Sequence, residues 1–133
     1  SYSGRFASFT NVSSNPKPAQ SSVPIVVGGH SRAAAERAGR LGDGFFPGRG
    51  SPAELAESFD IVRQTAAAAG RDPSAIEFSA GHPGIFGDDP VGAVQEMASI
   101  GVGRIIVPAF TMMKPSPTEA MEQFAERVIR RVQ

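Results

Sequence analysis

Apolar residues recur along the chain in two alternating patterns. Short continuous apolar runs, typical of buried strands, occupy Pro24–Val27, Gly44–Pro47, Ala75–Ala80 and Arg104–Phe110. Each run is followed by a stretch in which apolar residues return every three or four positions, as on one face of a helix. The pattern therefore predicts four βα units over residues 24–133.

The predicted helices have recognisable ends. Ser31 can cap a helix over Arg32–Leu41, and Gly42 stands where a C′ glycine belongs. Ser51-Pro52-Ala53-Glu54 and Ser116-Pro117-Thr118-Glu119 each combine a capping box with proline at the first helical position, and Asp89-Pro90 opens the helix between them. The residues expected on the buried helix faces are Leu55, Phe59, Val62 and Ala66, then Val91, Val94 and Ala98, then Met121, Phe124, Ala125 and Val128.

The first 23 residues follow another pattern. A Ser3-Gly4 turn signal followed by Phe6 and Phe9 predicts a short hairpin-like arm, and Asn11–Ser22 contains prolines that favour an extended connector. We therefore divide the chain into an arm and connector, residues 1–23, and the four βα units, residues 24–133.

Alternating β and α segments predict an α/β fold with a parallel sheet and helices outside it. Such a sheet can stay open, as a small α/β sheet, or form half of an eight-stranded (β/α)₈ TIM barrel. A complete barrel needs roughly 250 residues, and this chain has 133. If it is a barrel piece, it is a half, and its four strands would leave two edges and one apolar face uncovered. We then expect self-association or pairing with the missing half.

Composition narrows the function classes. Thirteen basic residues balance thirteen acidic ones, which argues against nucleic acid or a membrane surface as the partner. The chain contains no cysteine, which excludes disulfides and thiolate chemistry, and its two histidines show no metal-binding spacing. No apolar stretch approaches the ~20 residues of a membrane span. We expect a soluble, cytoplasmic protein without a metal site.

The sequence Gly28-Gly29-His30-Ser31 lies at the carboxyl end of a predicted strand and opens a helix. Ligands of βα folds bind at these ends, and the amides and dipole of a helix N-terminus favour an anion. Gly48-Arg49 follows the next strand and could add a charged clamp. These six residues form a candidate phosphate site. The alternative is a tight turn with an N-cap beside a solvated arginine.

Two further segments follow strands. His82, in Gly81-His82-Pro83-Gly84, could touch substrate or act as an acid or base, although histidines in such loops are more often structural. Met112-Met113-Lys114 could line a substrate pocket or, as we favour, pack under the last helix.

The stretch PKPAQSSVPIVVGGHSRAAAERAGRLGDGFFPG, residues 16–48, resembles the luciferase-like monooxygenase superfamily. The later sequences DPVGAVQEMASIGVGRIIVP, residues 89–108, and FAERVI, residues 124–129, resemble it as well. The nearest branch is the coenzyme F420-dependent oxidoreductases.

The resemblance implies a (β/α)₈ barrel, of which this chain would hold strands five to eight and the end of an insertion. It also implies that a cofactor phosphate binds at Gly29, His30 and Ser31 and at Gly48 and Arg49. The catalytic residues would lie in the first four strands, outside this chain, so the catalytic set stays unknown.

The function implied for the intact protein is hydride transfer between F420 and a small organic substrate. An FMN-dependent monooxygenase is the close alternative. A non-catalytic half-barrel that binds a phospholigand is the alternative from another class.

Overall fold

The structure is a computed structural model that describes residues 1–114 and 116–132. Four parallel strands lie side by side in chain order: β3 (Val26–Gly28), β4 (Gly44–Phe46), β5 (Glu77–Ala80) and β6 (Arg104–Ile105). Helices connect them: α1 (Arg32–Leu41), α2 (Pro52–Ala68) and α3 (Pro90–Ser99), with α4 (Pro117–Arg127) after the last strand. The predicted α/β class with a parallel sheet is confirmed.

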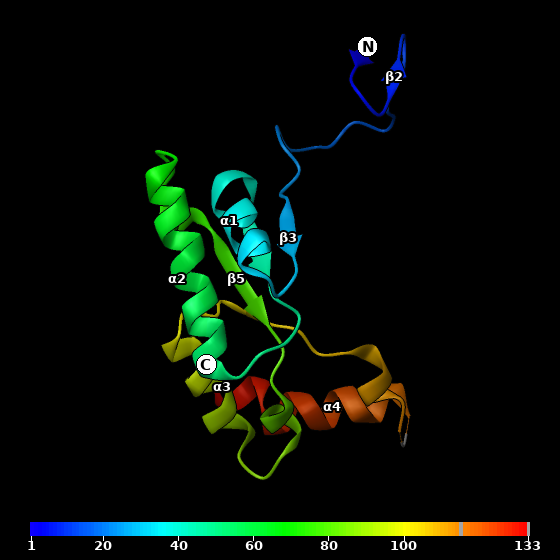
Figure 1. Cartoon of the computed structure of the whole chain (residues 1–133). Coiled ribbons are helices and arrows are strands. Elements are labelled where there is room, and N and C mark those ends of the chain that lie inside the picture. Colours follow the sequence, from blue (N-terminus) through cyan, green and yellow to red (C-terminus); the bar gives the residue numbers. More distant parts are fainter. Residues whose placement is uncertain (115, 133) are drawn as a thin grey trace.

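Short elements complete the chain. The 3-10 turns are η1 (Pro73–Ala75), η2 (Pro83–Phe86), η3 (Ala109–Met112) and η4 (Ile129–Arg131). Two two-residue strands, β1 (Tyr2–Ser3) and β2 (Ser8–Phe9), pair antiparallel as the predicted hairpin. This hairpin and the connector stand apart from the sheet and helices (Figure 1). Their side chains are almost all exposed; the Phe6 residue is 90% accessible.

One hydrophobic core lies between the sheet and the helices. Phe59 of α2 stacks on Phe78 of β5 with ring centroids 4.3 Å apart, and it meets Phe45 of β4 edge-on at 6.3 Å. Met97 of α3 and three alanines of α1 belong to the same buried cluster. The alanines let α1 pack closely on α2, where a Cβ added at Gly39 would lie 2.6 Å from the Val62 carbonyl oxygen.

The helix ends follow the sequence closely. The Ser31 side chain accepts from the Ala34 amide, and α1 has the predicted bounds. Ser51 and Glu54 form a complete capping box, and Asp89 caps α3. At α4 the Ser116 hydroxyl accepts from the Glu119 amide, which is one half of the predicted box.

Gly42 differs from its prediction. It is the C-cap residue of α1 with φ −87°, so it is not a left-handed C′ glycine. Steric crowding explains why a glycine stands at this position, because an added Cβ would lie 3.0 Å from the Gly44 carbonyl oxygen and 3.1 Å from a Val27 methyl.

Two predicted strands are shorter than expected. The third begins at Glu77 because Asp72 and Pro73 open the turn η1, whose Ala75 was predicted as strand. The fourth ends at Ile105, and the Ile106 amide makes the next bond, to Ala80 O at 2.8 Å. Pro108 has no amide hydrogen, so the chain turns into η3 instead of continuing to Phe110.

The predicted faces of the last two helices were partly wrong. α3 buries Pro90, Ala93 and Met97 rather than Val91, Val94 and Ala98. Both sets are apolar and spaced for one helix face, so the pattern alone could not separate them. In α4 the buried residue is Ala120, while Met121 is 55% exposed.

The first sheet strand also differs from its prediction. A continuous apolar run predicted burial on both faces, yet within β3 Val26 is 49% exposed. Side chains alternate between the faces of a strand. Only the Val27 face meets the helix-side core.

Candidate functional site

The carboxyl ends of β3 and β4 lie next to each other because Gly28 pairs in register with Phe46. The Gly29 amide continues the pairing by donating to the Phe46 carbonyl at 3.1 Å. Gly29 then takes φ +124° and Gly48 takes φ +80°, a region that favours glycine. Both loops turn sharply at the strand ends, and the sheet register brings the two predicted glycine sites together.

His30 and Arg49 meet across these loops. Arg49 Nη2 lies 2.8 Å from His30 Nε2. A guanidinium can only donate, so His30 Nε2 is the acceptor of this hydrogen bond. The histidine thus holds the arginine beside the start of α1. Sequence reasoning selected both residues but missed their contact.

The amides of this loop differ in what they already bind. Gly29 N is used by the sheet and Ala34 N by the Ser31 cap. The backbone donors left for an anion at this end are therefore those of residues 30–33, at the N-terminus of α1. A Cβ added at Gly28 would meet only Phe46 O, at 3.9 Å, and one at Gly48 would meet nothing within 4 Å. There is room at these positions for a ligand to approach the backbone.

A hollow with a volume of about 350 Å³ adjoins the pair, lined by His30, Arg49, Glu54 and Ser58 among others. The Glu54 carboxylate accepts from the Ser51 amide and hydroxyl, both at 2.8 Å. These bonds, the backbone one first, lower the pKa of Glu54. The carboxylate is therefore charged at neutral pH, and it lines the same hollow as the Arg49 cation. An anion fits best at the α1 end, away from Glu54.

A second hollow, of about 330 Å³, spans the carboxyl ends of β4, β5 and β6. Arg49 lies on one wall, His82 and Phe86 follow β5, and Ile106 and Pro108 follow β6. The structure thus brings Arg49 and His82 to one cavity, as their positions after strands required.

The His82 ring is held on both sides. Its Nδ1 accepts from the Gly84 amide at 3.1 Å and caps η2, and its Nε2 lies 3.5 Å from a Glu96 carboxylate oxygen on α3. Both ring nitrogens serve the local fold, which gives the residue a structural role. A role in catalysis stays a prediction.

Other regions of the chain are placed as follows. Asp43, between α1 and β4, accepts from the Ile25 amide at 2.9 Å, at the opposite end of the strands from the glycine loops. Met112 and Lys114 line a third hollow, beneath α4, and Met113 is exposed. Within residues 1–114 and 116–132, no three His, Asp or Glu side chains come together as a metal site would need. No helix in the described ranges is both long and apolar enough to cross a membrane.

The fold and the strand-end loops define a βα protein with a candidate ligand site at the carboxyl edge of a parallel sheet. The luciferase-like monooxygenase family model matches residues 1–132, so the chain belongs to that family. The predicted family is confirmed.

Comparison with solved structures agrees on the fold. The coenzyme F420-dependent tetrahydromethanopterin reductase from Methanopyrus kandleri superposes with a TM-score of 0.68 at 13% identity, covering 84% of this chain. The match spans 51% of the reductase, so this chain corresponds to about half of its length. A riboflavin lyase structure, with modified FMN and riboflavin, matches 56% of this chain and 17% of its own at 26% identity and a TM-score of 0.39. No curated protein sequence matches the chain.

Proposed function

We propose that this chain supplies the phosphate-binding part of an F420-dependent oxidoreductase, whose intact form transfers a hydride between F420 and a small organic substrate. The observation that carries the proposal is the His30–Arg49 contact over two glycine turns at the start of a helix. Family membership supports the oxidoreductase class.

The residues present fit the phosphate of such a cofactor. The amides of residues 30–33 and the α1 dipole would bind phosphate oxygens, and Arg49 would donate to them from the neighbouring strand. His30 accepts from Arg49 and holds its guanidinium beside the start of α1. The deazaflavin ring, when bound, supplies the hydride chemistry, while the protein binds and orients it.

The same proposal describes the chain as half of a (β/α)₈ barrel, residues 1–23 being the arm and 24–133 strands five to eight. The exposed face of β3 supports this, because an apolar strand gains stability only when its second face is covered. The catalytic groups would then come from the other half, and His82 would serve the loop that carries it.

The test is a titration of the chain with F420 and with FMN, followed by fluorescence. Arg49→Ala removes a charge-assisted hydrogen bond, which contributes about 1.5–3 kcal/mol, so F420 binding should weaken roughly tenfold to a hundredfold. Arg40→Ala, at the exposed far end of α1, is the matched control and should change nothing. Equal affinity of the Arg49 variant and the original chain would refute the site.

The cofactor identity has its own measurement. Mass spectrometry of the cofactor that co-purifies with the intact protein should find F420. Tightly bound FMN would instead favour the monooxygenase. A third measurement is the turnover of reduced cofactor by the intact protein. Turnover is expected of either enzyme, whereas a non-catalytic half-barrel that binds a phospholigand would show none.

A further inference from the structure

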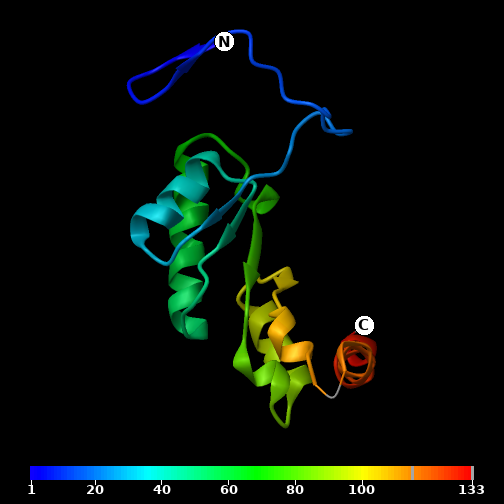
Figure 2. The ribbon, with the colours of Figure 1, turned by 90° about the vertical axis from the view of Figure 1, so that its right-hand side faces the viewer.

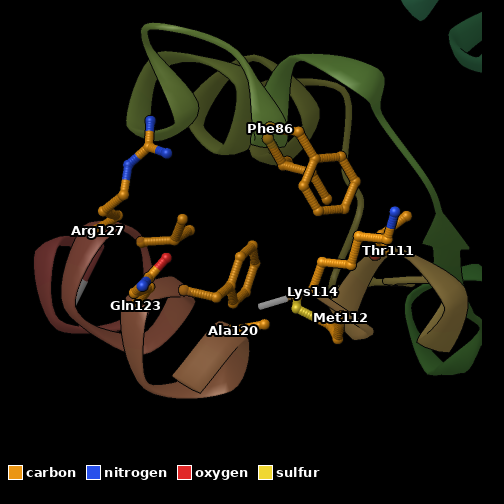
Figure 3. A pocket seen from close by; sticks show the side chains of 10 residues that line it. Phe86, Thr111, Met112, Lys114, Ala120, Gln123 and Arg127 are labelled. Carbon is orange, nitrogen blue, oxygen red and sulfur yellow. The ribbon is translucent and has the colours of Figure 1, made fainter. Parts of the chain in front are cut away.

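A third hollow lies between η2, η3 and α4, away from the glycine loops (Figure 3). Its volume is about 140 Å³. It shares Ile85 and Phe86 with the cavity over β4–β6, but it shares no residue with the His30–Arg49 hollow. It can therefore bind a ligand independently of the proposed phosphate site.

Six of the ten described lining residues of this hollow, the α4 pocket, are apolar: Ile85, Phe86, Met112, Ala120, Phe124 and Val128. Ile85, Ala120 and Val128 are buried at its base. Phe86 of η2 and Phe124 of α4 flank it, with ring centroids 6.3 Å apart and planes tilted by 43°. An apolar cavity of about 150 Å³ suffices to hold benzene. The α4 pocket thus has the size and the lining for one aromatic ring or an aliphatic body of that volume.

The rim of the pocket is cationic. Lys114 and Arg127 belong to the lining, together with the neutral polar side chains of Thr111 and Gln123, and its ten described lining residues include no carboxylate. Lys114 and Thr111 lie on one side in Figure 3 and Arg127 on the other. Arg127 already donates to the Gly87 carbonyl at 3.0 Å, which ties α4 to the loop before α3. Lys114, exposed on a flexible stem, is the cation that can follow a ligand.

We propose that the α4 pocket binds a small monocarboxylate whose apolar body is one aromatic ring or its equivalent, with the carboxylate at Lys114. The ring packs against Phe86 and Phe124, beside Val128. The carboxylate stays at the rim, where it remains partly hydrated and accepts from the ammonium and from Gln123. An uncharged apolar ligand would gain only the packing of its ring. A short anion would gain only the hydrogen bonds of its carboxylate.

Benzoate is the probe, with benzamide as its uncharged analogue and acetate as the anion without an apolar body. Titrations of the 133-residue chain, followed by NMR, should show benzoate moving the Phe86 and Phe124 ring signals. Benzoate should bind at least about tenfold more tightly than either analogue, because a charge-assisted hydrogen bond contributes about 1.5–3 kcal/mol. Equal affinity for benzoate and acetate, or no movement of these rings, would overturn the proposal.

The chain offers a matched pair of lysines, since Lys17 and Lys114 are the two that it contains. Lys114→Gln should reduce benzoate affinity to that of benzamide, while Lys17→Gln, in the exposed connector, should leave it unchanged. Arg49→Ala should leave it unchanged as well, which separates this site from the phosphate site. Unaltered benzoate binding by Lys114→Gln contradicts the assignment.

Filling the pocket gives a second variant. Ala120→Leu places a larger side chain in the cavity and should abolish binding of benzoate and benzamide alike. Circular dichroism checks that the variant folds. If it does not fold, the proposal is still tested by the benzoate-induced ring shifts of the unaltered chain and by the comparison of Lys114→Gln with Lys17→Gln. A folded Ala120→Leu chain that binds benzoate as before shows that the ligand lies elsewhere.

Discussion

The two faces of the sheet differ in almost every property. On the face under the helices, Phe45, Phe78 and Ala80 are buried with at most 5% of each side chain accessible. On the opposite face, Val26 is half exposed, and Glu77 pairs with Arg104 at 2.9 Å across β5 and β6. The ribbon shows α1 and α2, in cyan and green, beside the strands, and the arm, in blue, extending away from them (Figure 2).

The two faces therefore contribute differently: the covered face stabilises the fold, and the open face favours association. The covered face holds an aromatic core formed by residues of the chain itself. The open face combines apolar strand residues with a charged pair, and it can gain stability only by meeting another surface. Substitutions on the two faces should therefore have different consequences.

The largest effect belongs to the covered face. Phe59→Ala should lower the free energy of unfolding by roughly 3–5 kcal/mol, because Phe59 is fully buried between two aromatic rings. Urea denaturation measures the loss. Phe110→Ala is the control, since Phe110 is 78% exposed and should matter little. Equal losses at both positions would mean that the helix layer does not form the core.

The open face should drive association. We expect the chain to sediment above its monomer mass of 13.9 kDa at high concentration. Val26→Lys, on the edge strand β3, should shift it towards the monomer, because a lysine blocks both apolar packing and strand pairing. Val23→Lys, equally exposed but in the connector, should not. A stable monomer throughout the concentration range would contradict this expectation.

An intermediate effect is expected at the start of α2, on the covered side. Ser51→Ala removes the two bonds of the Ser51 hydroxyl, one from the Glu54 amide and one to the Glu54 carboxylate, and should cost about 1 kcal/mol. The Ser51 amide bond, which is the first cause of the lowered pKa of Glu54, remains in the variant, and only the hydroxyl's part of that lowering is lost. That part stabilises the fold fully above the unfolded pKa of about 4.3 and is lost as pH falls through the lower folded value. The difference between the two chains should thus shrink between pH 6 and pH 3. A pH-independent difference would show that Glu54 takes no part. Ser116→Ala, at the less buried α4, should cost less.

The smallest effect is expected from the charged pair of the open face. Glu77→Gln should change the free energy of unfolding by less than about 1 kcal/mol, because both side chains are well exposed to solvent. Glu36→Gln, in the exposed pair of α1, should behave alike. If Glu77→Gln costs several kcal/mol in an associated form, the pair is buried there, which would identify the open face as the contact surface.

The elements were more predictable than their packing. The bounds of α1, the Ser51–Glu54 box and the Asp89 cap follow from side-chain bonds to amides two or three residues away. The buried face of α3 was not predictable, because it depends on neighbours distant in the chain. The same holds for the site: the glycines and Arg49 could be selected by position, but the His30–Arg49 contact required the β3–β4 register.

The sequence alone therefore predicted the class of fold, the order of its elements, the helix caps and the family. Caps and turns depend on φ preferences and hydrogen bonds between near neighbours, so they can be derived one segment at a time. Tertiary structure decided which apolar residues form the core, that one strand face stays open, and that His30 holds Arg49. Those outcomes depend on the shapes of surfaces that meet only after the chain has folded, and no local pattern contains them.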